Sequence, residues 1–87
     1  TLRHLQVFEM VCAKLSVTAA AEALNMTQPA VSIAIRELES FYRTRLFDRI
    51  GRRIYLTEQG RRLREDARAI LSRFDESVRV LRDEAFH

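Results

Sequence analysis

Apolar residues recur at helical spacing in four stretches of the chain, and the third stretch is the most informative. From residue 27 it reads TQPAVSIAIRELES, with apolar positions at i, i+4, i+7 and i+11. This pattern predicts an amphipathic helix over about residues 28–41, with one core-facing stripe. Thr27 suits the N-cap, and Pro29 is tolerated in the first turn because its missing N–H would be unpaired there. The stripe consists of Val31, Ile35, Leu38 and Tyr42.

The opposite stripe of this helix carries short polar groups, an apolar tip and a single arginine. A merely solvated helix face would carry more charge, so this surface suits contact with a partner. Arg36 could fork onto a guanine or bind a phosphate. Ile33 could pack on a thymine methyl group or be an incidental exposed side chain. The stripe consists of Gln28, Pro29, Ser32, Ile33, Arg36 and Ser40.

A short alanine-rich stretch, residues 17–24, precedes this helix. Its apolar positions at i, i+3, i+4 and i+7 predict a second helix, which Ser16 or Thr18 can cap. Small side chains at Ala20 and Ala21 would let two helix backbones approach closely, although helix propensity alone also explains an alanine run. Asn25 and the residue after it can turn the chain sharply. The two helices together predict a helix–turn–helix, whose second helix enters the DNA major groove.

Residues 2–15 predict the first helix of the chain. One face of it is apolar, while Arg3, Glu9 and Lys14 lie off that face. We expect this face to form the centre of a modest core, because 87 residues make one small domain. The apolar face consists of Leu2, Leu5, Phe8, Val11, Cys12 and Leu15.

Two short β-favouring runs flank Gly51 in the sequence DRIGRRIYL. A glycine between strand-like runs predicts a hairpin, with Leu46 and Phe47 as core anchors just before it. A solvated loop is the alternative, but three arginines crowd the turn within five residues without an acidic residue. A basic hairpin after a helix–turn–helix is the plan of a winged helix, whose wing lies along the DNA backbone or in the minor groove. The three arginines are Arg49, Arg52 and Arg53.

The last stretch predicts a helix from Glu58 to about Ala85, with Thr57 as its cap. Gly60 is a poor helix residue and indicates a close approach of neighbouring groups. A helix of this length extends roughly 40 Å, too far to be covered by so small a domain. Its 4-3-4-3-4 heptad seam needs a partner helix, and a second copy of the chain is the simplest supplier. The seam is Leu63, Ala67, Ile70, Phe74, Ser77 and Leu81, flanked by Leu71, Val78 and Ala85.

The net charge of +3 is unevenly distributed. Residues 1–57 hold eight basic and five acidic groups, whereas residues 58–87 hold seven of each. Residues 41–57 alone contain five arginines and one aspartate. A basic front with a neutral tail indicates an anionic partner for the front.

The chain offers little chemistry for catalysis. It has no phosphate-binding glycine loop, no nucleophile–base set and no group of metal ligands, so we expect no enzyme, no cofactor and no metal. Cys12, the only cysteine, cannot form an intramolecular disulfide and is expected to be a buried thiol. His4 and His87 are expected at the solvated surface. No secretory signal or transmembrane run is visible, which favours the cytoplasm and no membrane partner.

These residues together resemble the N-terminal DNA-binding domain of LysR-type transcriptional regulators, over essentially the whole chain. The resemblance implies a winged helix–turn–helix followed by a linker helix that dimerises, and a separate C-terminal effector-binding domain that this chain lacks. A full-length protein could then assemble further into a tetramer. The chain also begins without methionine and stops at His87 without a terminating signal, so we expect a fragment. The matching positions are Ser16, Thr18, Ala20, Ala21, Leu24, Thr27-Gln28-Pro29-Ala30-Val31-Ser32, Ile35, Leu38-Glu39, Leu46-Phe47, Arg49, Arg52, Leu56-Thr57 and Gly60.

The resemblance also implies roles for single residues. Thr27 would lie near a phosphate at the helix start, and Arg52 or Arg53 would lie in the wing. The chain departs from the family pattern at Ile33 and Ala34, where polar or basic residues are common, and at Arg43, where a glycine commonly ends the recognition helix. The residues carried over as facing bases or nearby phosphates are Gln28, Pro29, Ser32, Ile33 and Arg36.

The sequence therefore predicts a mainly α chain in two parts. Residues 1–57 form a winged helix–turn–helix of three helices and a small β-hairpin, and residues 58–87 form a dimerisation helix. The predicted function is sequence-specific binding of double-stranded DNA by a homodimer that regulates transcription. The alternative is a helical interaction module that dimerises through its last helix and binds an acidic protein. Competition with duplex DNA at two salt concentrations separates the two.

Overall fold

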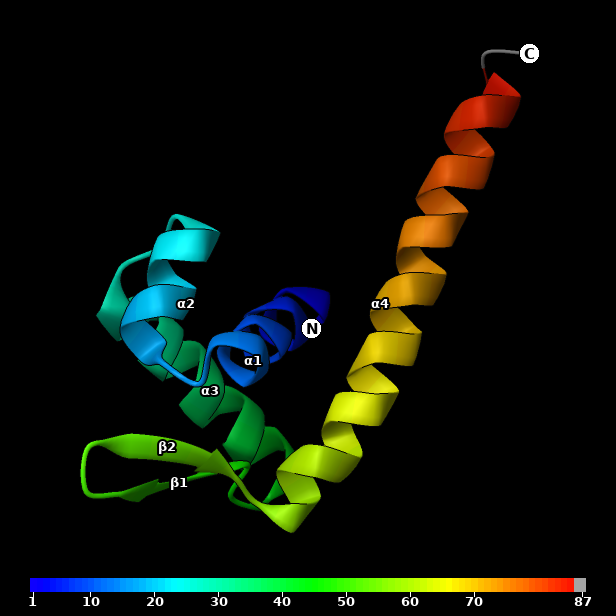
Figure 1. The fold of residues 1–87 in the computed structure, drawn as a ribbon. Helices are drawn as coiled ribbons and strands as arrows, with labels where there is room; N and C mark the ends of the chain where they lie inside the picture. The colour runs from blue at the N-terminus through cyan, green and yellow to red at the C-terminus, as the bar shows by residue number, and fades with distance from the viewer. Residues whose placement is uncertain (86–87) are drawn as a thin grey trace.

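A computed structural model of the chain describes residues 1–85, with side-chain surroundings as far as Asp83. Four helices and one antiparallel hairpin form a winged helix–turn–helix with a long last helix, as predicted (Figure 1). Among the described residues, no helix is both long and apolar enough to span a membrane. The elements are α1 (Leu2–Lys14), α2 (Val17–Leu24), α3 (Gln28–Tyr42), β1 (Phe47–Ile50), β2 (Arg53–Leu56) and α4 (Glu58–Ala85).

Hydroxyl side chains cap the first three helices. The Thr27 hydroxyl accepts a hydrogen bond from the Ala30 N–H at 3.2 Å, and the Ser16 hydroxyl accepts one from the Ala19 N–H at 3.1 Å. Both contacts satisfy a backbone donor that has no partner inside the helix. At their C-terminal ends these helices stop at left-handed residues, Leu15, Asn25 and Arg43, none of which is a glycine.

Helix α1 lies at the centre of the core and packs against α2, α3 and α4. The ring of Phe8 meets that of Phe47 with centroids 5.5 Å apart, which joins the helices to the hairpin. Val7 is fully buried although it lies off the predicted stripe, because α1 is covered on more than one side. The prediction of buried Leu2, Leu15 and Tyr42 is wrong, because all three lie at helix ends and are exposed.

The N-terminal half of helix α4 packs against the rest of the chain and forms ion pairs with it. The Glu9 carboxylate of α1 accepts a hydrogen bond from Arg68 Nε at 3.1 Å and lies 3.7 Å from Arg64 Nε. Leu63 is only 7% exposed and Ala67 is fully buried within the single chain. The prediction that these two residues await a partner helix is therefore wrong, because the core of their own chain covers them.

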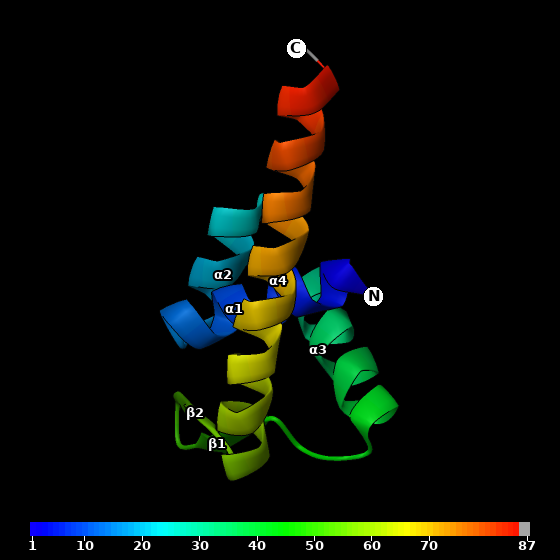
Figure 2. The ribbon, with the colours of Figure 1, turned by 90° about the vertical axis from the view of Figure 1, so that its right-hand side faces the viewer.

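The upper part of α4 extends past the body without cover from the other elements (Figures 1 and 2). The seam residues Ile70, Phe74 and Leu81 are exposed there. The flanking Val78 is half-buried, and Leu71, also half-buried, packs against the core of the body. The unpartnered part of the seam thus begins at Ile70. Ala85 and His87 lie outside the residues whose side chains the structure describes.

The hairpin is joined tightly to the base of α4. Strand β1 pairs with β2 from Phe47 opposite Leu56 to Ile50 opposite Arg53, and Gly51 occupies the turn at φ 65°. The Thr57 hydroxyl donates to the Arg45 carbonyl at 2.7 Å and accepts from the Gly60 N–H at 3.0 Å. A Cβ atom on Gly60 would overlap the Leu46 carbonyl oxygen, so the close approach predicted from the sequence is present.

Candidate nucleic-acid interface

The outward face of α3 gathers the polar-stripe residues predicted to read a partner. Thr27, Gln28, Pro29 and Arg36 are exposed, and Ser32 is half-buried. On the opposite side of the helix Val31, Ile35 and Leu38 are buried, which fixes the direction in which the polar stripe faces. Ile33 is 47% exposed and points away from the core that its apolar neighbours form.

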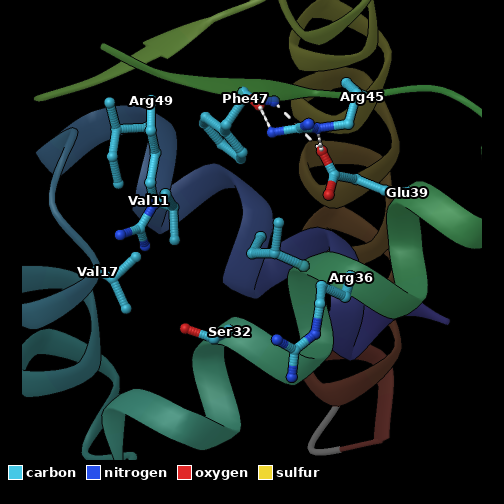
Figure 3. Close-up of a pocket in the computed structure, with 10 residues that line it drawn as sticks. Val11, Val17, Ser32, Arg36, Glu39, Arg45, Phe47 and Arg49 are labelled. Atoms are coloured by element: carbon cyan, nitrogen blue, oxygen red, sulfur yellow. Dashed lines mark hydrogen bonds and ion pairs between the residues drawn. The ribbon is translucent and has the colours of Figure 1, made fainter. Parts of the chain in front are cut away.

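The hairpin and α3 enclose a groove of about 260 Å³, shown in Figure 3. Ser32 and Arg36 project from α3, and Arg49 reaches down from the hairpin towards Val17 (Figure 3). Arg49 shares a face of the hairpin with Phe47, because side chains alternate along a strand. The groove therefore presents arginines from two different elements, α3 and β1.

A second hollow of about 240 Å³ continues from this groove towards the start of α2. Its lining includes Ser16, which caps α2, Thr18 of α2, Gln28 of α3, and Arg49 and Arg52 of the hairpin. Hydroxyl, amide and guanidinium groups around one hollow are suited to an anion such as a phosphate, which accepts several hydrogen bonds.

The three arginines predicted for the wing do not share one orientation. Arg49 lines both hollows and Arg52 lines the second. Arg53 pairs across the hairpin with Ile50, on the face opposite to Phe47, and it lines neither of these two hollows. The sequence places all three within five residues but does not separate the two faces of a hairpin whose register is unknown.

Glu39 positions the hairpin relative to α3, a role that its place in the sequence does not predict. Its Oε2 accepts hydrogen bonds from the N–H of Leu46 at 2.7 Å and of Phe47 at 3.4 Å. It also lies 3.7 Å from Arg45 Nε, and Arg45 donates to the Phe47 carbonyl at 3.1 Å. These contacts join α3 to the first strand of the hairpin. The only signal in the sequence was the Leu38-Glu39 pair within the family resemblance.

The remaining reactive or titratable candidates lie away from this surface. Cys12 is a buried core side chain, and its burial raises the pKa of its thiol to about 12. His4 is not simply solvated, because its Nε2 lies 3.4 Å from Oε1 of Glu37 and joins α1 to α3. Neither residue lines the two hollows beside the hairpin.

Comparison with known proteins identifies the family. The family model described as bacterial regulatory helix-turn-helix protein, lysR family, matches residues 2–61. The chain belongs to the LysR family. This confirms the resemblance drawn from the sequence and places the chain among regulatory helix–turn–helix proteins, not among enzymes.

Relatives in the family are named as regulators. Over 81 residues the chain is 44% identical to the RuBisCO operon transcriptional regulator of Allochromatium vinosum, covering 93% of the chain and 27% of that protein. Over 86 residues it is 41% identical to the HTH-type transcriptional regulator CfxR of Cupriavidus necator, covering 95% of the chain and 27% of that protein. The chain thus spans about a quarter of the length of these relatives.

Solved structures match the whole fold. The DNA-binding domain of BenM in complex with catB site 1 DNA has a TM-score of 0.93 and 33% identity, covering 98% of this chain and 96% of that chain. The DNA-binding domain of CbnR in complex with DNA has a TM-score of 0.90 and 33% identity, covering 98% of both chains. These LysR-family structures share the winged helix–turn–helix and the long last helix.

Proposed function

We propose that this chain binds double-stranded DNA sequence-specifically as a homodimer and serves as the DNA-binding part of a bacterial transcriptional regulator. Residues 1–57 contact DNA and residues 58–87 link and dimerise, while the first turns of α4 also complete the core. The carrying observation is the polar outward face of α3 beside a groove with arginines, in a fold that matches domains solved with DNA. Such a regulator acts in the cytoplasm, where bacterial DNA lies.

In this proposal α3 enters the major groove and supplies sequence choice. Arg36 and Ile33 reach base edges or nearby phosphates from the middle of the helix. Thr27 lies at the helix start, where backbone N–H groups favour a phosphate. The other contacts of α3 come from Gln28, Pro29 and Ser32.

The hairpin supplies most of the electrostatic affinity. Arg49 and Arg52 flank the hollows beside α3, where a phosphate of the backbone would meet guanidinium, hydroxyl and amide groups. Arg53, on the other face of the hairpin, would meet DNA only where the tip enters the minor groove. Contacts of this kind release counterions, so they make binding strongly dependent on salt.

Dimerisation uses the part of the α4 seam that the single chain leaves open. The contacts predicted from the sequence at Leu63 and Ala67 belong instead to the core of each protomer. The five remaining contact residues are exposed or half-buried, and of these Leu71 also packs against the core of its own chain. The proposed contact residues are Ile70, Leu71, Phe74, Val78 and Leu81.

Selection of binding sites from random duplexes tests this function. We expect the chain to enrich one inverted-repeat sequence, because a two-fold dimer presents two copies of α3. Each enriched duplex is then competed against random duplex at two salt concentrations. Failure to enrich any sequence, together with equal retention of an acidic protein competitor, would favour the interaction module over the regulator.

A further inference from the structure

Glu9 of α1 pairs with two arginines of α4. Arg68 Nε donates to Glu9 Oε1 at 3.1 Å, and Arg64 Nε lies 3.7 Å from the same oxygen. The side chains of Glu9 and Arg64 are 25% and 27% exposed, whereas that of Arg68 is 60% exposed. We call these three residues the α1–α4 charge cluster. It joins the body of the chain to the long last helix.

The α1–α4 charge cluster contains two buried polar atoms that have no hydrogen-bond partner, Oε2 of Glu9 and Nε of Arg64. A movement of α4 away from α1 would take the Arg68 donor from Glu9 as well. A partly buried carboxylate without a donor is unfavourable, so this movement is opposed. A movement of α4 towards α1 is opposed by Ala67, which is already fully buried. The cluster therefore fixes the separation of the two helices at this height.

The base of α4 is held at one point, which acts as a pivot. The Thr57 N–H donates to the Leu46 carbonyl at 3.0 Å, and a Cβ atom on Gly60 would overlap the same carbonyl oxygen. Along the helix, Arg68 lies about 12 Å beyond Gly60, and Ala85 lies about 37 Å beyond it. In proportion to these lengths, a shift of about 1 Å at Arg68 moves the far end of α4 by about 3 Å.

The apolar contact between α4 and the body defines the tilt of α4 less sharply. Leu63, Ala67 and Leu71 pack against the core, but apolar contacts are non-directional. A hydrogen bond between charged groups has a preferred distance and direction. Beyond Arg68, no residue of α4 in the described part of the chain makes a polar contact with another element (Figure 2). The charge cluster is thus the last directional contact before α4 leaves the body.

We propose that Glu9 is a positioning residue for DNA recognition, which holds Arg64 and Arg68, fixes the tilt of α4 on the body and so sets the half-site spacing that the dimer prefers. The proposal rests on the proposed homodimer and goes beyond it, because it concerns a contact inside each chain. Two bodies joined through their α4 helices hold their α3 helices at a separation that depends on this tilt. The tilt therefore decides which half-sites two copies of α3 can reach together.

The lengths involved match the step between neighbouring base pairs. Lengthening the spacer by one base pair moves the half-sites apart by about 3.4 Å. A shift of about 1 Å at Arg68 produces a displacement of this size at the far end of α4. A duplex with the wrong spacing is then bound only if α4 tilts, which breaks the hydrogen bond between Arg68 and Glu9.

Distances between spin labels on the body and on α4 test the tilt directly. Labels are attached to Lys14→Cys at the end of α1 and to Arg79→Cys on α4, both at exposed positions, in chains diluted with excess unlabelled protein. The native Cys12 stays unlabelled, because burial raises the pKa of its thiol to about 12. We expect one narrow distance distribution, which Glu9→Ala broadens or shifts by about 2 Å or more at this height. An unchanged distribution in Glu9→Ala would overturn the proposal.

Two further variants separate a lost contact from a lost fold. Arg68→Ala removes the hydrogen bond to Glu9 but leaves Arg64 beside it, so it should change the distances less and in the same direction. It also carries the test if circular dichroism shows that Glu9→Ala does not fold. Glu37→Ala is the matched control, because it removes the ion pair between His4 of α1 and Glu37 of α3, which does not involve α4. Its distances should equal those of the wild type.

Half-site spacing tests the consequence for DNA. The half-site selected by the wild type is placed twice in duplexes whose spacer is lengthened or shortened by one base pair, and the dissociation constant of each is measured. In Glu9→Ala the preference for the best spacing should fall about threefold to tenfold, the value of one charge-assisted hydrogen bond at a partly exposed site. The affinity for an isolated half-site should stay unchanged, as should the spacing preference of Glu37→Ala.

The remaining outcomes overturn the proposal in distinguishable ways. Equal spacing preferences in dimeric wild type and dimeric Glu9→Ala would exclude a role in spacing and leave the homodimer intact. An equal loss of affinity for the isolated half-site and for every spacing would show that Glu9 acts only through the stability of the body. Wild-type monomers at every concentration would remove the homodimer, and the role of Glu9 in spacing with it.

Discussion

At the residue scale, Ile33 is the departure from the family pattern with the clearest chemical consequence. It is 47% exposed in the middle of the polar stripe, on the side of α3 opposite to the buried Val31 and Ile35. A branched apolar tip in the major groove can pack against the C5-methyl group of thymine. Such a contact would favour T·A at one position of each half-site without a hydrogen bond.

Uracil scanning tests this role of Ile33. Replacing thymine with uracil at the contacted position should cost roughly 1 kcal/mol, the value of one buried methyl group, in the wild type only. The cost should vanish in Ile33→Ala, because the side chain that meets the methyl group is gone. If no position across the half-site shows a uracil cost that depends on Ile33, then Ile33 is an incidental exposed side chain.

Arg43 adopts a left-handed backbone conformation that is unfavourable for a residue with a side chain. It ends α3 at φ 56°, in the left-handed region where glycine meets no steric penalty. Arg43→Gly should raise the free energy of unfolding by about 1 kcal/mol, measured by urea denaturation. Ser40→Ala, at an exposed position inside the same helix, is measured for comparison. A destabilised Arg43→Gly would mean that the Arg43 side chain stabilises the fold by more than its backbone conformation costs.

At the element scale, the wing divides its arginines between two faces. Arg52 lines the hollow beside α2 and α3, whereas Arg53 lies on the face with Ile50. The binding constant K falls as salt rises. Removing one phosphate contact makes the fall of log K with log salt less steep, by about 0.9. The double variant Arg52→Ala/Arg53→Ala should therefore lose about one unit of slope on any duplex. The single variants show which face carries the contact, and an unchanged slope in the double variant would mean that the wing does not touch DNA.

The elements themselves could be predicted well from periodicity and capping residues. The starts of α2, α3 and α4 fall at the expected positions, because Ser16, Thr27 and Thr57 are local signals whose hydrogen bonds form inside a few residues. The hairpin follows from Gly51 for the same reason. Residue burial was harder to predict where it depends on which elements pack together.

Leu63 and Ala67 illustrate that difficulty. Both fit a heptad seam, and a seam looks the same in sequence whether a partner chain or a helix of the same chain covers it. Helix α1 covers the base of α4 with the help of Glu9, an acidic residue expected to lie off the apolar face of α1. Long-range contacts such as those between Glu39 and the N–H groups of Leu46 and Phe47 leave a similarly weak pattern in the sequence.

At the scale of the whole molecule, the length of α4 sets the architecture. The chain measures 54 Å in its longest dimension, against 25 and 19 Å in the other two. The upper part of α4 exposes Ile70, Phe74 and Leu81 on one side. A folded body at one end and an uncovered apolar seam at the other are what a two-chain assembly would require.

Charged residues in the open part of the seam should break this assembly. Ile70→Glu/Phe74→Glu should sediment as a folded monomer that binds a half-site weakly, because two carboxylates cannot be buried at a helix–helix contact without partners. Ser72→Glu, an exposed position on the opposite side of α4, is the matched control and should remain a dimer. A dimeric double variant would place the dimer contact elsewhere.

Sequence-specific binding of DNA by this chain is tested by comparing two dissociation constants. The dissociation constant is measured at a single physiological salt concentration for the selected inverted-repeat duplex and for a shuffled duplex of the same composition. A sequence-reading dimer should bind the selected duplex at least about 10³-fold more tightly. Equal dissociation constants for the two duplexes would show that the chain holds the DNA backbone without reading its bases, and would contradict sequence-specific binding.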